Sequence, residues 1–200
     1  MNTAGPRTRR PPIPQAVFPF VPFDLPAVLE SVRRERVPEA PAGIPVAFYE
    51  QESLACIHFR KEGATGIGLH AILNRAELPE MVLRFLFTHE LLHTVIPSRE
   101  IRGKLVAHPP EFFEAELRAV PVGEVADAWS WIWANFSTHL KRQTRAQRID
   151  VKRGWRDSFR QPLLTIEECR ERGETAGNAA ESGFFFPMDF ETGEAFAIAA

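Results

Sequence analysis

The chain has 200 residues, of which 44% are hydrophobic and 25% charged, and its formal net charge at pH 7 is −2. A chain of this length forms one domain that buries its core without disulfides, and its balanced charge excludes a global electrostatic footprint for nucleic acid. The two cysteines, Cys56 and Cys169, lie far apart and outside any C-x-x-C pair, which excludes a four-cysteine zinc ribbon and is typical of a reducing compartment.

The first part of the chain is predicted to be irregular. Residues 1–16 are rich in proline, arginine and threonine, a composition that predicts a disordered arm. Phenylalanines alternate with prolines over residues 18–23, which indicates an extended segment laid on the core. Asp24 can then cap a helix with Pro26 in its first turn, and we expect this helix to run to about Arg36.

Three strands and a buried helix are expected next. Residues 44–50 and 54–61 are rich in β-forming residues and partly alternate, and 67–73 predicts a third strand that forms a hairpin with the second across a glycine-containing turn. The helix predicted over 78–95 is apolar around most of its surface. Such a helix is typical of a buried central element.

The remaining helices are predicted at 111–120, 124–145 and 165–172 from their turn residues and apolar periodicity. In the second of them, Trp129 and Trp133 are four residues apart and share one helix face. We expect this face to pack on the central helix; the alternative is that the rings stack on a ligand.

These elements predict an α+β fold, in which a short antiparallel or mixed sheet packs on a central helix and further helices follow towards the C-terminus. The predicted organisation has three parts: a disordered arm over residues 1–16, a single domain over 17–172, and a C-terminal extension over 173–200 that packs on the core. The sequence contains no internal repeat.

The chemistry is suggested by the string His89-Glu90-Leu91-Leu92-His93 inside the predicted central helix. Histidines at positions i and i+4 lie on one helix face, where both imidazoles can bind one zinc ion. Glu90 between them is then placed to act on a water as general base. Because H-E-x-x-H also arises by chance, a third ligand at a workable distance is needed to support the interpretation.

His108 is the expected third ligand, since it lies 15 residues after His93, behind a loop and just before a predicted helix. Carboxylates on that helix are the alternatives: Glu111 or Glu114, with Glu116 less favoured. Three protein ligands and one open position are typical of a catalytic zinc site. We therefore expect one catalytic Zn²⁺ ion and a hydrolytic reaction in which Glu90 accepts the proton of the activated water.

A family resemblance covers residues 44–118. The strand over residues 66–73, the helix segment Phe87–His93 and the stretch Ala107–Phe112 resemble the SprT-like branch of the zincin metallopeptidases. The resemblance implies a zincin-like fold, metal ligands at the three histidines named above, and Glu90 as catalytic base. Pro109 stands where the family usually has a glycine, and the chain lacks the cysteines of the family's C-terminal zinc ribbon.

The same resemblance implies where a substrate lies. The last strand before the H-E-x-x-H helix, with Gly68, Leu69, His70 and Ala71, would be the edge strand along which an extended peptide binds. Backbone hydrogen bonds to a sheet edge make this physically reasonable.

The expected function is therefore that of a zinc-dependent metallopeptidase with a peptide or protein substrate. A metal-dependent hydrolase of a non-peptide amide, or a regulatory zinc-binding module without turnover, remain alternatives. The basic stretch 141–156, with Trp155, is the local candidate for nucleic-acid contact, and its other interpretation is a solvated helix end. No run of about 18 apolar residues occurs, so we expect no membrane span and a cytoplasmic location. The sequence does not indicate an oligomeric state.

Overall fold

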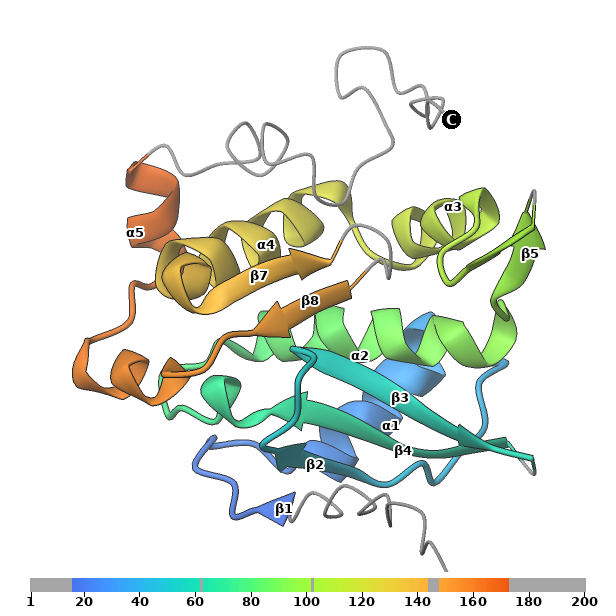
Figure 1. The fold of residues 1–200 in the computed structure, drawn as a ribbon, viewed down its shortest axis with the longest axis horizontal. Helices are drawn as coiled ribbons and strands as arrows, with labels where there is room; N and C mark the ends of the chain where they lie inside the picture. The colour runs from blue at the N-terminus through green and yellow to red at the C-terminus, as the bar shows by residue number, and fades with distance from the viewer. Residues whose placement is uncertain (1–15, 62, 102, 144–147, 173–200) are drawn as a thin grey trace, which may run out of the picture.

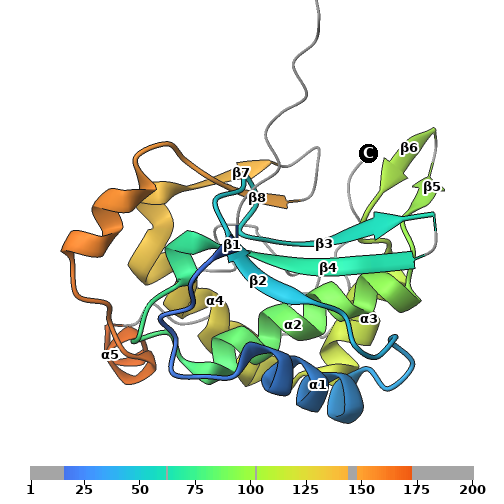
Figure 2. The same cartoon turned by 90° about the horizontal axis from the view of Figure 1, so that it is seen from below.

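The computed structural model describes residues 16–61, 63–101, 103–143 and 148–172. The fold is α+β, as predicted: a four-stranded sheet carries helices α1 and α2 on one face (Figures 1 and 2). The strands stand in the order β1-β2-β4-β3, and their bounds are Ala16–Val17 for β1, Val46–Tyr49 for β2, Ala55–Arg60 for β3 and Gly63–His70 for β4.

Strand β4 lies inside the sheet, because it pairs in parallel with β2 and antiparallel with β3. The prediction that Gly68, Leu69, His70 and Ala71 form an edge strand is therefore wrong. The first three are buried within β4, and Ala71 begins the short 3₁₀ helix η1, Ala71–Leu73. Residues 67–70 are all buried, as is typical of an interior strand, whereas the exposed residues 58–60 of β3 are typical of an edge.

The segment before α1 is held by hydrogen bonds between its backbone and the Asn74 side chain, which follows η1. Asn74 accepts a hydrogen bond from the Phe20 N–H at 2.6 Å and donates one to the Phe18 carbonyl at 2.8 Å. Phe18 and Phe20 are nevertheless 77% and 65% exposed, whereas Phe23 packs against the core. The segment is therefore laid on the core as predicted, but through its backbone and Phe23 and not through the other two rings. This segment lies at the β2 side of the sheet, away from β3.

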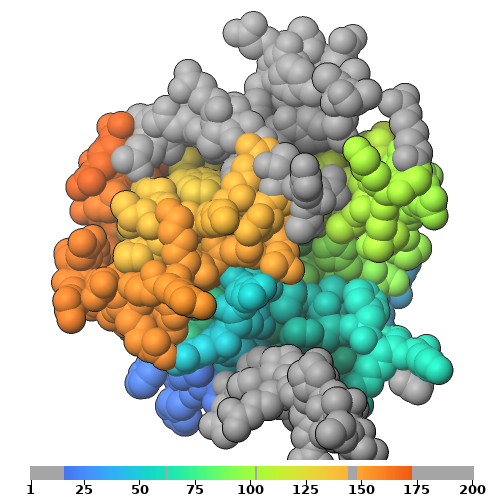
Figure 3. All heavy atoms as spheres, viewed as in Figure 1, coloured from blue at the N-terminus to red at the C-terminus, as the bar shows by residue number. Residues whose placement is uncertain are grey.

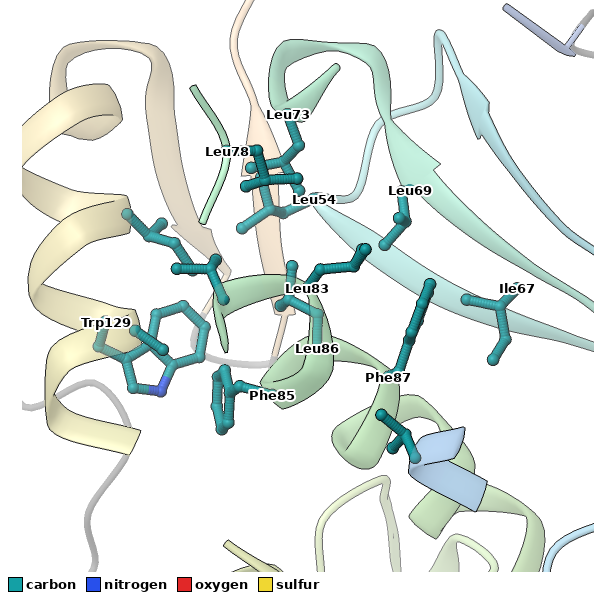
Figure 4. Close-up of a cluster of buried hydrophobic side chains, with 14 of the residues drawn as sticks. Leu54, Ile67, Leu69, Leu73, Leu78, Leu83, Phe85, Leu86, Phe87 and Trp129 are labelled. Atoms are coloured by element: carbon teal, nitrogen blue, oxygen red, sulfur yellow. The ribbon is translucent and has the colours of Figure 1, made fainter. Parts of the chain in front are cut away.

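Helix α1, Leu25–Arg36, has the predicted start, because the Asp24 side chain accepts a hydrogen bond from the Ala27 N–H at 3.1 Å. Helix α2, Glu80–Val95, is the predicted central helix, and most of its side chains up to Leu92 are buried. Figure 4 shows how it joins the layers: Phe87 lies towards the sheet, while Phe85 faces α4, where its ring meets Trp129 edge to face at 5.3 Å. The predicted packing of Trp129 on the central helix is confirmed.

A small hairpin and a helix follow α2. Strands β5, Arg99–Ile101, and β6, Lys104–Val106, pair where a connecting loop was predicted. Helix α3, Pro110–Ala119, matches the predicted helix and packs against α2. The loop between β6 and α3 carries His108, so the hairpin returns the chain to the C-terminal half of α2 (Figure 1).

Helix α4, Val122–Phe136, ends well before the predicted position 145. A 3₁₀ turn, Ser137–His139, leads into strand β7, Leu140–Gln143, which pairs with β8, Arg148–Val151. The prediction of a basic helix end is therefore wrong. The hairpin is fixed by distant contacts, since Leu54 N–H donates to the Ile149 carbonyl at 2.9 Å and Val151 N–H donates to the Glu52 carbonyl at 2.7 Å.

The described chain closes with a 3₁₀ helix η4, Trp155–Arg160, and helix α5, Ile166–Glu171, which confirms the predicted short helix. Thr165 and Glu168 form a reciprocal capping box at its start. In the described residues no helix is both long and apolar enough to cross a bilayer. The predictions of a disordered arm and of a packed C-terminal extension concern residues 1–15 and 173–200, which lie outside the described ranges.

Candidate metal centre

Three histidines meet where α2 passes beneath the loop before α3. His89 and His93 stand one turn apart on α2, and the Nε2 atom of His108 lies 3.1 Å from the Nε2 atom of each. Their candidate ligand atoms all fall within 4.8 Å of one another. The structure thus brings together the three histidines that the sequence selected, in a group that could hold a metal ion.

The two alternative carboxylates point elsewhere. Glu111 forms an ion pair with Arg99 at 3.0 Å and its side chain is 42% exposed, while the Glu114 side chain is 67% exposed. Neither belongs to the group of converging side chains. The geometry therefore favours His108 over both as the third ligand.

Glu116 has a role that the sequence interpretation missed. Its side chain is 3% exposed, and its Oε1 accepts a hydrogen bond from His89 Nδ1 at 2.7 Å. A carboxylate at this distance requires the proton of a neutral His89 to sit on Nδ1, which leaves the Nε2 lone pair directed at the other histidines. Such an outer carboxylate fixes the ring orientation of a metal-binding histidine.

The sequence does contain a signal for Glu116. Phe112 and Glu116 are four residues apart on the buried face of α3, so Glu116 is an acidic residue on an otherwise apolar face. Phe112 packs against all three histidines: its ring centroid lies 5.0 Å from that of His89, 4.6 Å from that of His93 and 4.7 Å from that of His108. A buried acid one turn from an aromatic contact to the histidines needs a partner.

The protonation states suit a cation. Burial, followed by the charge on His89, lowers the pKa of His93 to about 3 and that of His108 to about 2. Burial also acts to lower the pKa of His89, but the adjacent Glu116 carboxylate reverses the effect and raises it. His93 and His108 are therefore neutral imidazoles that offer lone pairs towards His89, and a cation bound between the three rings would displace a proton held by His89.

Glu90 shares the cleft with the histidines but is not one of the group. Burial raises its pKa to about 7, although the nearby His89 and a hydrogen bond from the Ile57 backbone N–H act to lower it. The bond from Ile57 ties Glu90 to the edge strand β3. A carboxyl group with a pKa near neutrality can both accept and release a proton.

The cleft around these residues has a volume of about 330 Å³. The residues that line it come from β3, from α2 with the histidines, from α4 and from β8. Figure 1 shows these elements close together, and on the face drawn in Figure 3 the orange atoms of the β8 region adjoin the teal atoms of the β3 region. The loop after β6 adds Ala107 and His108 to the lining. Apart from the three histidines and Glu90, the lining is mostly apolar and includes Leu54, Ala55, Ile57, Phe59, Leu86, Trp129 and Ile149.

His70 does not line this cleft. It is 1% exposed, its Nδ1 accepts a hydrogen bond from the Ile72 N–H at 2.9 Å, and its ring meets Trp155 edge to face at 4.8 Å. The expectation that His70 lies on the edge strand that binds the substrate is therefore wrong. Burial lowers the pKa of His70 to about 4, so it is a neutral helix cap at neutral pH.

The basic stretch 141–156 carries partly compensated charge. Arg148 bonds to Asp150 at 2.8 Å and to Glu52 at 3.0 Å, and Arg156 bonds to Glu50 at 2.6 Å. These pairs lie on β8 and η4. Nucleic-acid contact at this surface stays a prediction.

Comparison of the chain with protein-family models, with curated proteins and with solved structures finds no match. The activity of the protein is therefore inferred from the site itself.

Proposed function

We propose that this protein is a zinc-dependent metallopeptidase in which Glu90 is the general base. The observation that carries the proposal is the convergence of three histidine Nε2 atoms beside the buried Glu90, in a cleft with a sheet edge as its wall. The SprT-like resemblance of residues 44–118 points to the same ligand set and the same base.

The histidine geometry fits zinc. Four ligands at about 2.0–2.1 Å from a tetrahedral zinc stand about 3.3 Å apart, and His108 Nε2 lies 3.1 Å from both of its neighbours. Within the described part of the chain the group has no fourth ligand side chain, which supports an open coordination position. A bound zinc ion would acidify a water molecule and polarise the scissile carbonyl.

The residues of the chain supply the remaining steps. Glu90 takes the proton of the attacking water and delivers it to the leaving amine, for which a pKa near 7 is well matched. Glu116 holds His89 in one tautomer throughout, because its carboxylate accepts a hydrogen bond from the protonated Nδ1 atom of His89. The Ile57 N–H keeps the Glu90 carboxylate close to β3.

Strand β3 is the substrate wall in this proposal, in place of β4. Residues 52–54 are already bonded to β8, while among the described residues no strand pairs with the outer side of β3 from Ala55 onward. An extended peptide can add to such an edge through its backbone. A peptide bound in this way would have a peptide bond alongside Glu90 and the histidines.

The test compares wild type with Glu90→Gln, with Glu114→Gln as a matched control on an exposed position. Loss of the base should lower hydrolysis of a peptide library by roughly 10²–10⁴-fold, while zinc content stays at wild-type level. Equal hydrolysis by Glu90→Gln and wild type would falsify the mechanism. A panel of small amides run in parallel separates peptides from other amide substrates, and zinc binding without any hydrolysis by wild type would favour the regulatory module.

A further inference from the structure

Part of the cleft lining is apolar and comes from four elements of the fold; we call this part the inner pocket and define it by Leu54, Leu86, Trp129 and Ile149. We propose that the inner pocket receives a large uncharged side chain, such as leucine, methionine or phenylalanine, from the residue next to the scissile bond. The inference rests on the proposed peptidase function and names the substrate class of that site.

The pocket is assembled by four separate parts of the chain. Leu54 precedes β3, Leu86 belongs to α2, Trp129 to α4 and Ile149 to β8. Each is at most 5% exposed, yet each contributes to the cleft wall. Because four elements pack around it, the pocket is a preformed part of the fold and needs no loop to order around a ligand.

The position of the pocket ties it to the reacting groups. Leu86 precedes Glu90 by four residues, so the two side chains follow one another on the same face of α2. On the opposite wall, Ala55 and Ile57 line the cleft, and the Ile57 N–H bonds to Glu90. When a peptide bond lies beside Glu90, the side chain of the adjacent peptide residue can therefore reach the inner pocket.

Strand β8 ends the substrate strand at this point. The Leu54 N–H is already bonded to the Ile149 carbonyl, so a peptide paired with β3 cannot extend its pairing past Ala55. The peptide residue opposite Ala55 therefore lies next to the inner pocket, because the free edge of β3 ends there. At about 330 Å³ the whole cleft is at the small end of ligand sites, which fits an extended peptide of few residues.

The charges around the pocket exclude a charged side chain. Glu90 and Arg148 are the acidic and basic residues of the cleft lining, and the Arg148 guanidinium already bonds to Asp150 at 2.8 Å and to Glu52 at 3.0 Å. A lysine or aspartate side chain would lose its hydration against the four apolar residues, because Arg148 is already paired with two carboxylates and Glu90 is engaged as the general base in the proposed function. An apolar side chain gains from burial against leucine, isoleucine and tryptophan.

The experiment uses zinc-loaded full-length protein and a fluorogenic peptide library varied at each position around the cleaved bond. We expect leucine, methionine and phenylalanine to raise kcat/KM on the order of 10- to 100-fold over lysine and aspartate at one adjacent position. The variant Ala55→Ile narrows the pocket from its β3 wall and should shift the preference towards alanine. Ala47→Ile, the same change on β2 outside the cleft, should keep the wild-type preference.

A second measurement separates this inference from the peptidase proposal. Binding of uncleaved peptides to Glu90→Gln, measured by calorimetry, should show the same order of side chains. If wild type cleaves nothing while Glu90→Gln binds the leucine peptide at least tenfold more tightly than the lysine peptide, the pocket is supported and the peptidase proposal fails. Cleavage or binding that is indifferent to this side chain, or that prefers aspartate through Arg148, overturns the inference.

Discussion

Replacing Glu116 with glutamine isolates the contribution of the carboxylate that is hydrogen-bonded to His89 in the proposed metal centre. The side chain keeps its size and an oxygen acceptor, but it loses the charge that faces His89 Nδ1 at 2.7 Å. Glu116 is 3% exposed, so water screens this interaction little. Removing a carboxylate that orients a metal-binding histidine typically costs 10–100-fold in metal affinity.

We therefore expect Glu116→Gln to weaken zinc binding by roughly 10–100-fold, or about 1.4–2.7 kcal/mol. The assay is competition for zinc against a chelator of known affinity, at pH 7 and fixed ionic strength. Glu114→Gln is the matched control, because it makes the same change on the same helix at a side chain that is 67% exposed.

Zinc affinity that is unchanged in Glu116→Gln would refute the idea that this carboxylate orients His89. An equal loss in Glu116→Gln and Glu114→Gln would also refute it, because the effect would then come from the net charge of α3.

The pKa values and the helix caps give three further predictions. Because the pKa of Glu90 is raised to about 7 by burial and a metal ion nearby favours its charged form, zinc uptake at pH 7 should release more protons from wild type than from Glu90→Gln, measured by calorimetry in buffers of different ionisation enthalpy. His70 has a folded pKa of about 4, below its ordinary 6.5. Its contribution to the free energy of unfolding is therefore complete above pH 6.5 and is lost as pH falls towards 4, by up to about 3 kcal/mol. Denaturant titrations should show that the free energy of unfolding of His70→Asn declines less than that of wild type over this pH range, and an identical decline would contradict the assignment. Thr165→Ala removes one half of the capping box of α5 and should lower the free energy of unfolding by about 1 kcal/mol, whereas Thr165→Ser should keep it.

The helices and the group of three histidines could be predicted from the sequence because their signals are local. Asp24 and Thr165 mark helix starts through their own side chains. His89 and His93 depend only on helical periodicity, and His108 on a loop of workable length. Each of these inferences needed contacts between residues close in the chain.

The strand order could not be derived in this way. The hairpin of β3 and β4 was predicted, yet it is the parallel pairing of β2 with β4 that moves β4 inside the sheet and leaves β3 at the edge. Parallel pairing joins segments separated in sequence, and it has no turn signal. The continuous burial of residues 67–70 is the feature of β4 that reflects its interior position in the sheet.

The β7–β8 hairpin was missed for a related reason. Its strands are short and basic, and β8 is anchored by hydrogen bonds to residues 52–54, about a hundred positions earlier in the chain. Local patterns for residues 137–145 favoured a continued helix, and tertiary pairing overrode them. The same pairing closes the inner pocket, so this part of the site could be recognised only in the folded chain.

The metal centre is tested most directly by the metal content of purified, zinc-equilibrated protein, compared between wild type, His93→Ala, His108→Ala and His139→Ala. The last variant removes a histidine outside the converging group. We predict one zinc ion per chain in wild type and in His139→Ala, and a large loss in the other two. Zinc retained by His108→Ala at wild-type affinity, or a wild-type chain that binds no zinc, would contradict the three-histidine metal centre.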